Sequence, residues 1–306
     1  TLDYATPAMR NIPRVKVSRK ALRRGDIILE KSGGTPNRPV GIMAYYESDD
    51  VALCSNFNQV LRIDCSLSDS RYMFYQLCWL RERGAFAPLS RKTTGLQNLQ
   101  MSKFGDLQVK CPAKLVQRAR AESLYQIQQL VRDGKALINR LDDLVKSQFV
   151  EMFGDPVEVI DAIPLGSIAL LKAGNATTAA SISETDADGL YPCYGGNGLR
   201  GYAAEFTHEG VFPLIGRQGA QCGNVKLASG KFRATEHAVV VQPTIEIDPI
   251  WLFHYLRYDD LGRLATGAAQ PGLSVKNLNQ IPVSIPPIAL QQQFADFVAR
   301  VDKLGF

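Results

Sequence analysis

One series of sequence features occurs twice in this chain, in the same order. In each copy an aromatic, helix-compatible segment, 71–80 or 250–256, is followed by a polar loop with a Thr-Gly pair, a short mixed segment and a proline. Several positions of the two copies coincide at a single offset of 174 residues. These pairs are Pro112 and Pro286, Gln117 and Gln291, Leu124 and Val298, Ile127 and Val301, and Leu130 and Leu304. An offset held over such a stretch indicates a duplicated unit, so the function must be one that needs two copies.

Each copy mixes strand and helix patterns. Residues 24–28 and 209–212 have the pattern of a strand that leads into a glycine-rich loop. The apolar runs 58–63 and 238–241 are typical of buried strands. Since segments with helical spacing follow in both copies, we expect an α+β fold with two mixed α/β domains, each followed by a long helix.

Residues 112–153 have the pattern of one long helix. Its apolar residues recur at spacings of three, four and seven, which is typical of a seam for another helix. They are Ile127, Leu130, Leu137, Leu141 and Leu144. A helix of about forty residues is about 60 Å long, too long to bury its apolar stripe within a small domain. The segment 287–306, with Phe297, Val301 and Leu304, is the candidate partner helix.

These patterns divide the chain into four segments. They are a first domain at 1–111, a spacer helix at 112–154, a second domain at 155–286 and the start of a second spacer helix at 287–306. At the offset of 174, the counterpart of Phe149 would follow Phe306 and the counterpart of Val157 would precede Thr1. We therefore expect the duplicated unit to continue beyond both ends of this sequence.

The composition excludes several classes of protein. With 306 residues, 45% of them hydrophobic and 21% charged, the chain can bury one or two ordinary cores. It has no run of about eighteen apolar residues and no signal-peptide pattern, so we expect a cytoplasmic protein without a membrane span. Its six cysteines include no Cys-x-x-Cys pair, which disfavours both a zinc site and a disulfide framework.

The net charge of +5 is unevenly distributed. Residues 1–111 contain 17 lysines and arginines against 10 acidic residues, whereas residues 154–306 contain 11 against 15. The basic first domain indicates an anionic partner. We expect the mildly acidic second domain to bind such a partner more weakly, because it must present its few cations locally.

No catalytic motif is complete. The segment 196–201 satisfies Gly-x-Gly-x-x-Gly, but it neither follows a long buried strand nor opens a helix, as dinucleotide binding requires. The histidines at 208, 237 and 254 lack metal-binding spacing, and His237 fits a bonded pair at a strand edge better than catalysis. Asp133-Gly134-Lys135 has a spacing found in some nucleases, but it lies within the predicted long helix. We therefore expect no catalytic residue, no metal and no enzyme activity.

Five segments together resemble the DNA specificity subunit of type I restriction-modification systems. They are Ser147-Gln-Phe-Val-Glu-Met-Phe-Gly-Asp-Pro156, Tyr191-Pro-Cys-Tyr-Gly-Gly-Asn-Gly-Leu-Arg-Gly-Tyr202, Ile215-Gly-Arg-Gln-Gly-Ala220, Ala234-Thr-Glu-His-Ala-Val239 and Ala269-Gln-Pro-Gly-Leu-Ser274. The resemblance covers essentially the whole chain and is strongest from about Ala136 onward. In the first domain the sequence matches the motifs of this family less closely.

The resemblance implies a function and partners. In that family each globular unit is a target recognition domain that reads half of a bipartite DNA site, and the two helices pack antiparallel as a coiled-coil spacer. The implied partners are double-stranded DNA, methyltransferase subunits and a restriction subunit that translocates or cleaves DNA. No cofactor is implied for this chain, since S-adenosylmethionine would be held by the methyltransferase. Self-association through incomplete helices stays open.

Polar loops in both domains offer side chains that bond phosphates and base edges. In the first domain the candidate DNA contacts are Lys31, Ser32, Thr35, Arg38, Arg91, Lys92, Thr93, Gln97 and Asn98. In the second domain they are Tyr194, Asn197, Arg200, Arg217, Gln218, Gln221, Lys231, Arg233 and Gln270. Glycines in these loops allow the backbone to approach a duplex closely.

Three alternatives stay open. One is the recognition part of a fused, type II-like restriction-modification enzyme, and another is a helical scaffold that binds proteins but not DNA. The third is a nuclease or methyltransferase whose site the sequence does not reveal. Salt-dependent binding to random duplex would exclude the scaffold, and S-adenosylmethionine binding by the isolated chain would favour the enzyme.

Overall fold

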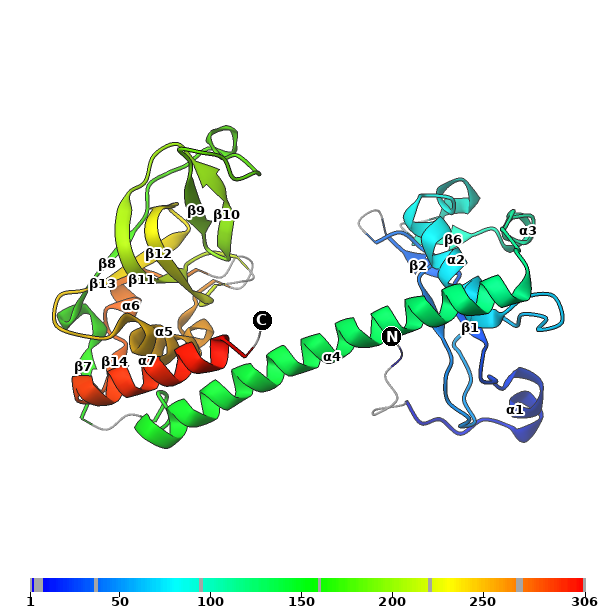
Figure 1. Ribbon diagram of the computed structural model, residues 1–306, viewed down its shortest axis with the longest axis horizontal. Helices are drawn as coiled ribbons and strands as arrows, with labels where there is room; N and C mark the ends of the chain where they lie inside the picture. Colours follow the sequence, from blue (N-terminus) through cyan, green and yellow to red (C-terminus); the bar gives the residue numbers. More distant parts are fainter. Residues whose placement is uncertain are drawn as a thin grey trace. The chain divides into compact units, whose positions relative to one another are not determined.

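The computed structural model describes residues 2, 8–35, 38–93, 96–158, 161–219, 222–267 and 272–304, without the side chains of residues 92 and 93. The chain divides into two compact units, residues 1–134 (unit 1) and 135–306 (unit 2). The division falls inside one long helix, labelled α4 in Figure 1. Each unit has its own hydrophobic core.

Unit 1 combines two small antiparallel sheets with short helices (Figure 1). Its strands are β1 (Ile27–Glu30), β2 (Ser32–Gly34), β3 (Met43–Tyr45), β4 (Asn58–Leu61), β5 (Ser90–Thr93) and β6 (Leu96–Leu99), in the orders β3-β1-β4 and β2-β6-β5. Its helices are α1 (Arg14–Lys20), α2 (Ser70–Glu82), the 3-10 turn η1 (Ala87–Leu89) and α3 (Met101–Gly105). Because side chains alternate along a strand, Ile27 and Leu29 enter the main core with Leu77 of α2, whereas Ile28 enters a smaller cluster on the other face.

Unit 2 is built on one six-stranded sheet with the order β10-β9-β12-β11-β13-β8. Its strands are β7 (Ile163–Pro164), β8 (Ala169–Ala173), β9 (Tyr191–Gly195), β10 (Gly198–Ala203), β11 (His208–Gly216), β12 (Val225–Ala234), β13 (Ala238–Pro243) and β14 (Pro282–Val283). Its helices are η2 (Leu165–Ser167), η3 (Ala179–Ser181), α5 (Pro249–Tyr258), η4 (Leu261–Leu264), α6 (Val275–Leu278) and α7 (Ile288–Asp302). β9 and β12 pair in parallel, and the other pairs are antiparallel. Fully buried Trp251, Leu252 and Leu256 of α5 belong to the same core as Val239 and Val241 of β13.

The long helix predicted for residues 112–153 is confirmed. α4 (Lys114–Phe153) contains 40 residues and begins two positions after Pro112. It continues through Gly134 and ends at Phe153, and the next residue, Gly154, has a φ of 82°, the left-handed conformation that commonly closes a helix. None of the helices in the described ranges combines the length and apolar composition that a bilayer-crossing helix needs.

The last turns of α4 belong to unit 2 and pack against α7. The ring of buried Phe149 lies 5.3 Å from the ring of Phe294, and Val145 and Val298 belong to the same core. Figure 1 shows the two helices side by side and running in opposite directions. The buried residues of α4 follow the spacing of four that suits a helix on a globular core.

The predicted seam residues fall into two groups. Leu141, Phe297 and Val301 belong to the unit 2 core or pack against it. The remaining residues have exposed fractions between 47% and 71% in the described chain; they are Ile127, Leu130, Leu137, Leu144 and Leu304. The sequence pattern thus missed Val145 and Phe149, which make the packing that the structure contains. A coiled coil through the exposed residues remains a prediction.

The duplication is visible in the order of the helices. The aromatic segments at 71–80 and 250–256 form α2 and α5, and the spacer segments form α4 and α7. The predicted buried strand at 238–241 is confirmed. A strand also forms within the predicted segment 58–63, but its predicted burial is wrong. β4 is an edge strand, and its residues are only partly buried.

Candidate nucleic-acid interface

In unit 1 most of the predicted DNA-contact residues gather on the sheet β2-β6-β5. The strand register places Asn98 opposite both Ser32 and Arg91, and the Ser32 hydroxyl donates a hydrogen bond to the Asn98 side-chain oxygen. Gln97 lies opposite residue 92, and the Lys31 carbonyl accepts a hydrogen bond of 2.8 Å from the Leu99 N–H. Two segments that are far apart in the sequence therefore present their polar groups on one small sheet.

Thr35 and Arg38 pair with each other just after β2. Their backbones exchange hydrogen bonds of 2.9 and 3.1 Å, and the Arg38 N–H also approaches the Thr35 hydroxyl at 3.1 Å. The largely exposed Arg38 guanidinium lies 3.5 Å from the carboxylate of Glu30. An exposed cation of this kind can exchange a weak surface pair for a phosphate or a base edge.

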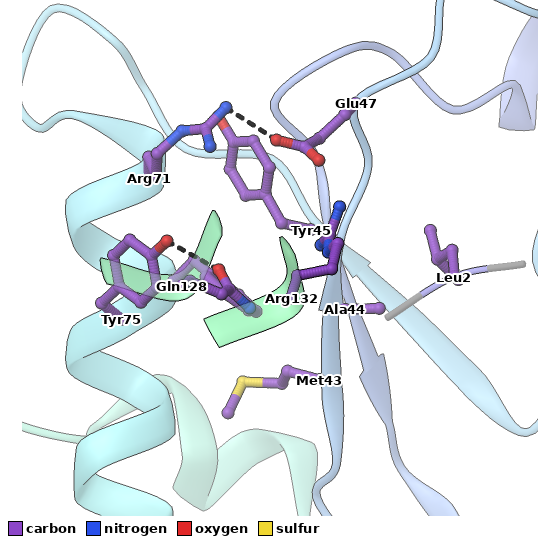
Figure 2. Close-up of a pocket in the computed structure, with 10 residues that line it drawn as sticks. Leu2, Met43, Ala44, Tyr45, Glu47, Arg71, Tyr75, Gln128 and Arg132 are labelled. Carbon is purple, nitrogen blue, oxygen red and sulfur yellow. Dashed lines mark hydrogen bonds and ion pairs between the residues drawn. The ribbon is translucent and has the colours of Figure 1, made fainter. Parts of the chain in front are cut away.

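A second polar feature of unit 1 is the small pocket of Figure 2, which has a volume of about 100 Å³. At its side Arg71 of α2 donates to Glu47 at 2.9 Å. The Arg71 guanidinium lies 4.8 Å from the ring centroid of Tyr45 and 4.0 Å from that of Tyr125 on α4. Burial lowers the pKa of Arg71 and Glu47 raises it, with a net increase above the ordinary value.

The contacts around this pocket fix α4 to unit 1. Figure 2 shows the Tyr75 hydroxyl directed at Gln128 of α4, and it donates to Oε1 at 2.9 Å. Burial raises the pKa of this hydroxyl, so it stays protonated as a donor. Since the Arg71 charge is already paired and stacked, we assign the pocket to anchoring the helix and not to binding an anion.

In unit 2 several turns meet at one end of the sheet. The Asn224 side chain donates to Asn197 Oδ1 at 2.8 Å, which joins the turn after β11 to the turn after β9. The Arg217 N–H donates to the His237 carbonyl at 3.0 Å, and Gln218 forms a bridge with Gly272. We call these five residues, Asn197, Arg217, Gln218, Asn224 and His237, the turn cluster.

The backbone of the turn cluster is held firmly. The Arg217 carbonyl accepts a hydrogen bond of 2.8 Å from the Leu273 N–H, so both backbone groups of this residue are bonded. Gly223 has a φ of 89°, and a Cβ there would lie 2.5 Å from the Gly262 nitrogen, so only glycine fits. The Arg217 side chain is partly exposed, and its buried Nε has no hydrogen-bond partner among the described residues. A fixed backbone with a partly exposed guanidinium that forms no ion pair within the described residues suits recognition of a guanine edge or a phosphate.

The other predicted residues of unit 2 lie outside this cluster. Tyr194 packs edge-on against Phe232 at 5.8 Å, and Arg233 donates to the Thr177 hydroxyl at 3.1 Å with little of its side chain exposed. Lys231 is exposed opposite Glu209, near the start of β11, and lies over the Phe206 ring at 5.0 Å. Arg200 is exposed on β10.

Some predicted contacts fall outside the described residues. They are Gln221, Gln270 and the side chains of Lys92 and Thr93.

Sequence reasoning did not select two members of the turn cluster. Asn224 and His237 belong to the cluster because of contacts between turns. Only the resemblance of residues 234–239 to the family motif pointed to His237. His237 lies 3.2 Å from the Glu236 carboxylate in the turn between β12 and β13. The strand-edge pair expected from the sequence is thus present.

The remaining histidines of unit 2 are packing residues. His208 stacks on Phe232 at 5.3 Å, and burial lowers its pKa. Burial lowers the pKa of His254 to about 4 beside Phe294. Within the described ranges no three histidine, cysteine or acidic side chains are grouped so that they could hold a metal ion.

Comparisons with known proteins show which family the second half of the chain is similar to. Residues 160–305 match the family described as type I restriction modification DNA specificity domain. The type I restriction enzyme EcoprrI specificity subunit of Escherichia coli is 46% identical over 143 residues, which are 46% of this chain and 35% of that protein. The chain therefore matches about a third of the length of this relative.

A solved structure extends the similarity to the fold of nearly the whole chain. The crystal structure of the type I restriction-modification system S subunit from M. genitalium has a TM-score of 0.63 and 20% identity, and the match covers 92% of this chain and 77% of that one. Residues 160–305 are thus similar to the type I DNA specificity family, and the fold of the chain is similar to that of this S subunit. The family resemblance and the α+β fold expected from the sequence are confirmed.

Proposed function

We propose that this chain is the specificity subunit of a type I restriction-modification system and reads double-stranded DNA. Each unit reads one half of a bipartite target, and the chain directs partner methyltransferase and restriction subunits to that target. The observation that carries the proposal is the match of residues 160–305, which contain the whole turn cluster, to the DNA specificity family.

The chemistry of the two polar surfaces supports two different readers. The sheet β2-β6-β5 offers Arg91, Gln97 and Asn98, whereas the turn cluster offers Arg217 and Gln218. Arginine pairs with guanine edges, and asparagine or glutamine with adenine edges. Because the two sets differ in residues and in backbone support, they suit different half-sites.

We assign no chemical step to this chain. The methyltransferase partner binds S-adenosylmethionine and transfers the methyl group, and this chain supplies sequence recognition. Isothermal titration of the isolated chain with S-adenosylmethionine tests the division of roles. We expect no heat of binding, and saturable binding would favour a methyltransferase instead.

The two spacer helices complete the proposed architecture. We propose that α4 and the segment that begins with α7 pack antiparallel through apolar residues that are exposed in the described chain, such as Leu130 on α4 and Leu304 just after α7. Exposed leucines at this density on a helix favour a helical partner over solvent. The docked helices would set the distance between the two readers.

Binding to random duplex DNA is the first experiment. We expect the full-length protein to bind, with the logarithm of its affinity falling linearly with the logarithm of the salt concentration, because phosphate contacts release counterions. The same titration on a negatively charged polypeptide controls for general polyanion binding. Absence of DNA binding at about 50 mM salt would favour the protein-binding scaffold and contradict the proposal.

A further inference from the structure

A buried glutamine joins the start of α4 to α2 in unit 1. Gln117 is the fourth residue of α4 and is only 1% exposed. Its side-chain oxygen accepts hydrogen bonds of 2.8 Å from the Asp69 N–H and from the Ser68 hydroxyl. Its amide nitrogen donates to the Pro112 carbonyl at 2.7 Å. A single side chain thus connects the spacer helix, the chain that enters it and the residue before α2.

The same arrangement occurs in unit 2. Gln291 is the fourth residue of α7 and is also 1% exposed. Its oxygen accepts from the Asp248 N–H at 2.9 Å, and its nitrogen donates to the Pro286 carbonyl at 2.8 Å. Asp248 caps α5 just as Asp69 caps α2, through side-chain acceptance from the first turn of the helix.

These hydrogen bonds define the geometry tightly. A backbone N–H meets only an acceptor and a carbonyl meets only a donor, so each network fixes the orientation of its amide group. Burial makes the loss of either partner costly, because the orphaned group has no water to replace it. Each glutamine therefore resists rotation of its spacer helix against the helix of the recognition domain.

We infer that Gln117 and Gln291 are positioning residues that set the angle between each recognition domain and its spacer helix, and thereby the gap between half-sites that the protein accepts. The inference rests on the proposed function, since a gap has meaning only for a bipartite reader. Neither glutamine belongs to the candidate DNA-contact surfaces, so their substitution leaves the base-reading groups in place.

The hydrogen-bond networks around Gln117 and Gln291, which we call the two joints, are not identical. In unit 1 the Ser68 hydroxyl adds a bond to the glutamine oxygen, and Cys111 Sγ lies 3.3 Å from the glutamine nitrogen. At the position before the capping aspartate, unit 2 has the buried apolar residue Ile247 in place of Ser68. We therefore expect substitution of Gln117 to affect gap selection more than substitution of Gln291.

The test compares gap selection in full-length protein with its partner subunits. Gln117→Met and Gln291→Met keep the size of the side chain and remove its hydrogen bonds. Gln126→Met on α4 and Gln292→Met on α7 are matched controls at exposed glutamines. Affinities are measured on duplexes with the preferred gap and with that gap changed by one base pair.

We expect Gln117→Met to lower the ratio of these affinities about fivefold, with the preferred bases of each half-site unchanged. Hydrogen exchange at the Asp69 amide should become faster, while the two sheets of unit 1 keep their protection and so report that the fold is intact. The controls should keep the wild-type ratio.

Two results would overturn the inference. One is an equal loss of affinity at every gap, which indicates a purely structural role, and the other is an unchanged ratio together with faster exchange at Asp69. Failure of the proposed function has a different signature, since the wild-type protein would then show no gap preference. If Gln117→Met fails to fold, Gln291→Met in the other unit is subject to the same criteria.

Discussion

At the scale of single residues, a buried imidazole makes the stability of unit 2 depend on pH. His254 shares a hydrogen bond of 3.0 Å with the Tyr258 hydroxyl, and burial followed by the nearby Arg257 lowers its pKa to about 4 from an ordinary 6.5. The unfolded chain therefore binds a proton that the folded unit excludes. The stability is fully present above pH 6.5 and falls as the pH decreases towards 4.

We predict that His254→Phe removes this pH dependence. At pH 5 the wild-type unit should lose about 2 kcal/mol relative to pH 7, and the variant should lose less. Urea unfolding can be followed through the fluorescence of buried Trp251 in a Trp79→Phe background. An equal loss in both proteins would show that other groups cause the acid sensitivity.

Substitution of Arg217, in the turn cluster, and of Lys231, outside it, should affect DNA binding in different ways. We predict that Arg217→Ala weakens binding to the second half-site at least about tenfold and relaxes the preference at one base position. Lys231→Ala should weaken binding uniformly across sequences and reduce the salt slope by about one. Fluorescence anisotropy on matched and mismatched half-sites measures both effects. A uniform loss for Arg217→Ala would remove it from base reading.

The sequence allowed candidate contact residues to be selected by their chemistry, but it could not indicate which of them lie together. Asn197, Arg217 and Gln218 were selected because their side chains can bond base edges, and the structure brings them together. Arg233 was selected on the same ground, but its side chain is taken up by Thr177 within the unit. Asn224 was missed, since its place depends on a contact between two turns that no local pattern reveals.

At the scale of elements, α1 presents positive charges that no acidic side chain in the described part of the chain neutralises. It contains Arg14, Lys16, Arg19 and Lys20 with no buried residue, and none of these four cations forms an ion pair within the described part of the chain. In Figure 1 it lies at the opposite end of unit 1 from β2 and β6. This position suits contacts with phosphates that carry no sequence information.

We predict that changing the four cations of α1 to glutamine weakens binding to all duplexes equally. The slope of log affinity against log salt should decrease by up to about 3.6, because each of the four phosphate contacts would contribute about 0.9. The ratio of specific to random affinity should stay constant. If the ratio falls while the slope stays unchanged, α1 contributes to base reading and not to general attraction.

α4 was the most predictable element and its packing was the least predictable. Regular apolar spacing, an early proline and the terminal Gly154 were sufficient to place it over 40 residues. The residues that α4 buries in unit 2 include Val145 and Phe149. They are four positions apart and therefore lie on the same face of the helix, towards the core of the unit. A heptad pattern cannot distinguish a partner helix from a domain core.

The length of α4 should determine the accepted gap. We predict that seven residues inserted after exposed Asn139 lengthen the helix by about 10 Å in nearly the same rotational phase and shift the preferred gap. Neither half-sequence should change. Asn139→Ala, without the insertion, is the control and should keep the original gap. An unchanged gap in the lengthened protein would refute the role of the helix as a ruler.

At the scale of the whole molecule, the duplication is unequal in a way that suits two different readers. The helices α2 and α5 and the joints at Gln117 and Gln291 repeat closely, whereas the sheets and the polar surfaces differ. The sequence indicated the repeat through scaffold positions, which geometry constrains in both copies. It could not indicate that unit 2 has a six-stranded sheet and unit 1 two smaller ones, because strand order depends on contacts between distant segments.

Selection of bound duplexes from a random library tests the central claim most directly. The full-length protein with its partner subunits is incubated with the library, and the retained DNA is sequenced. We predict two short, different sequences separated by a gap of constant length and unspecified bases. Substitution of Arg217 should change only one of them. A single contiguous sequence, or retention without any sequence preference, would contradict the account.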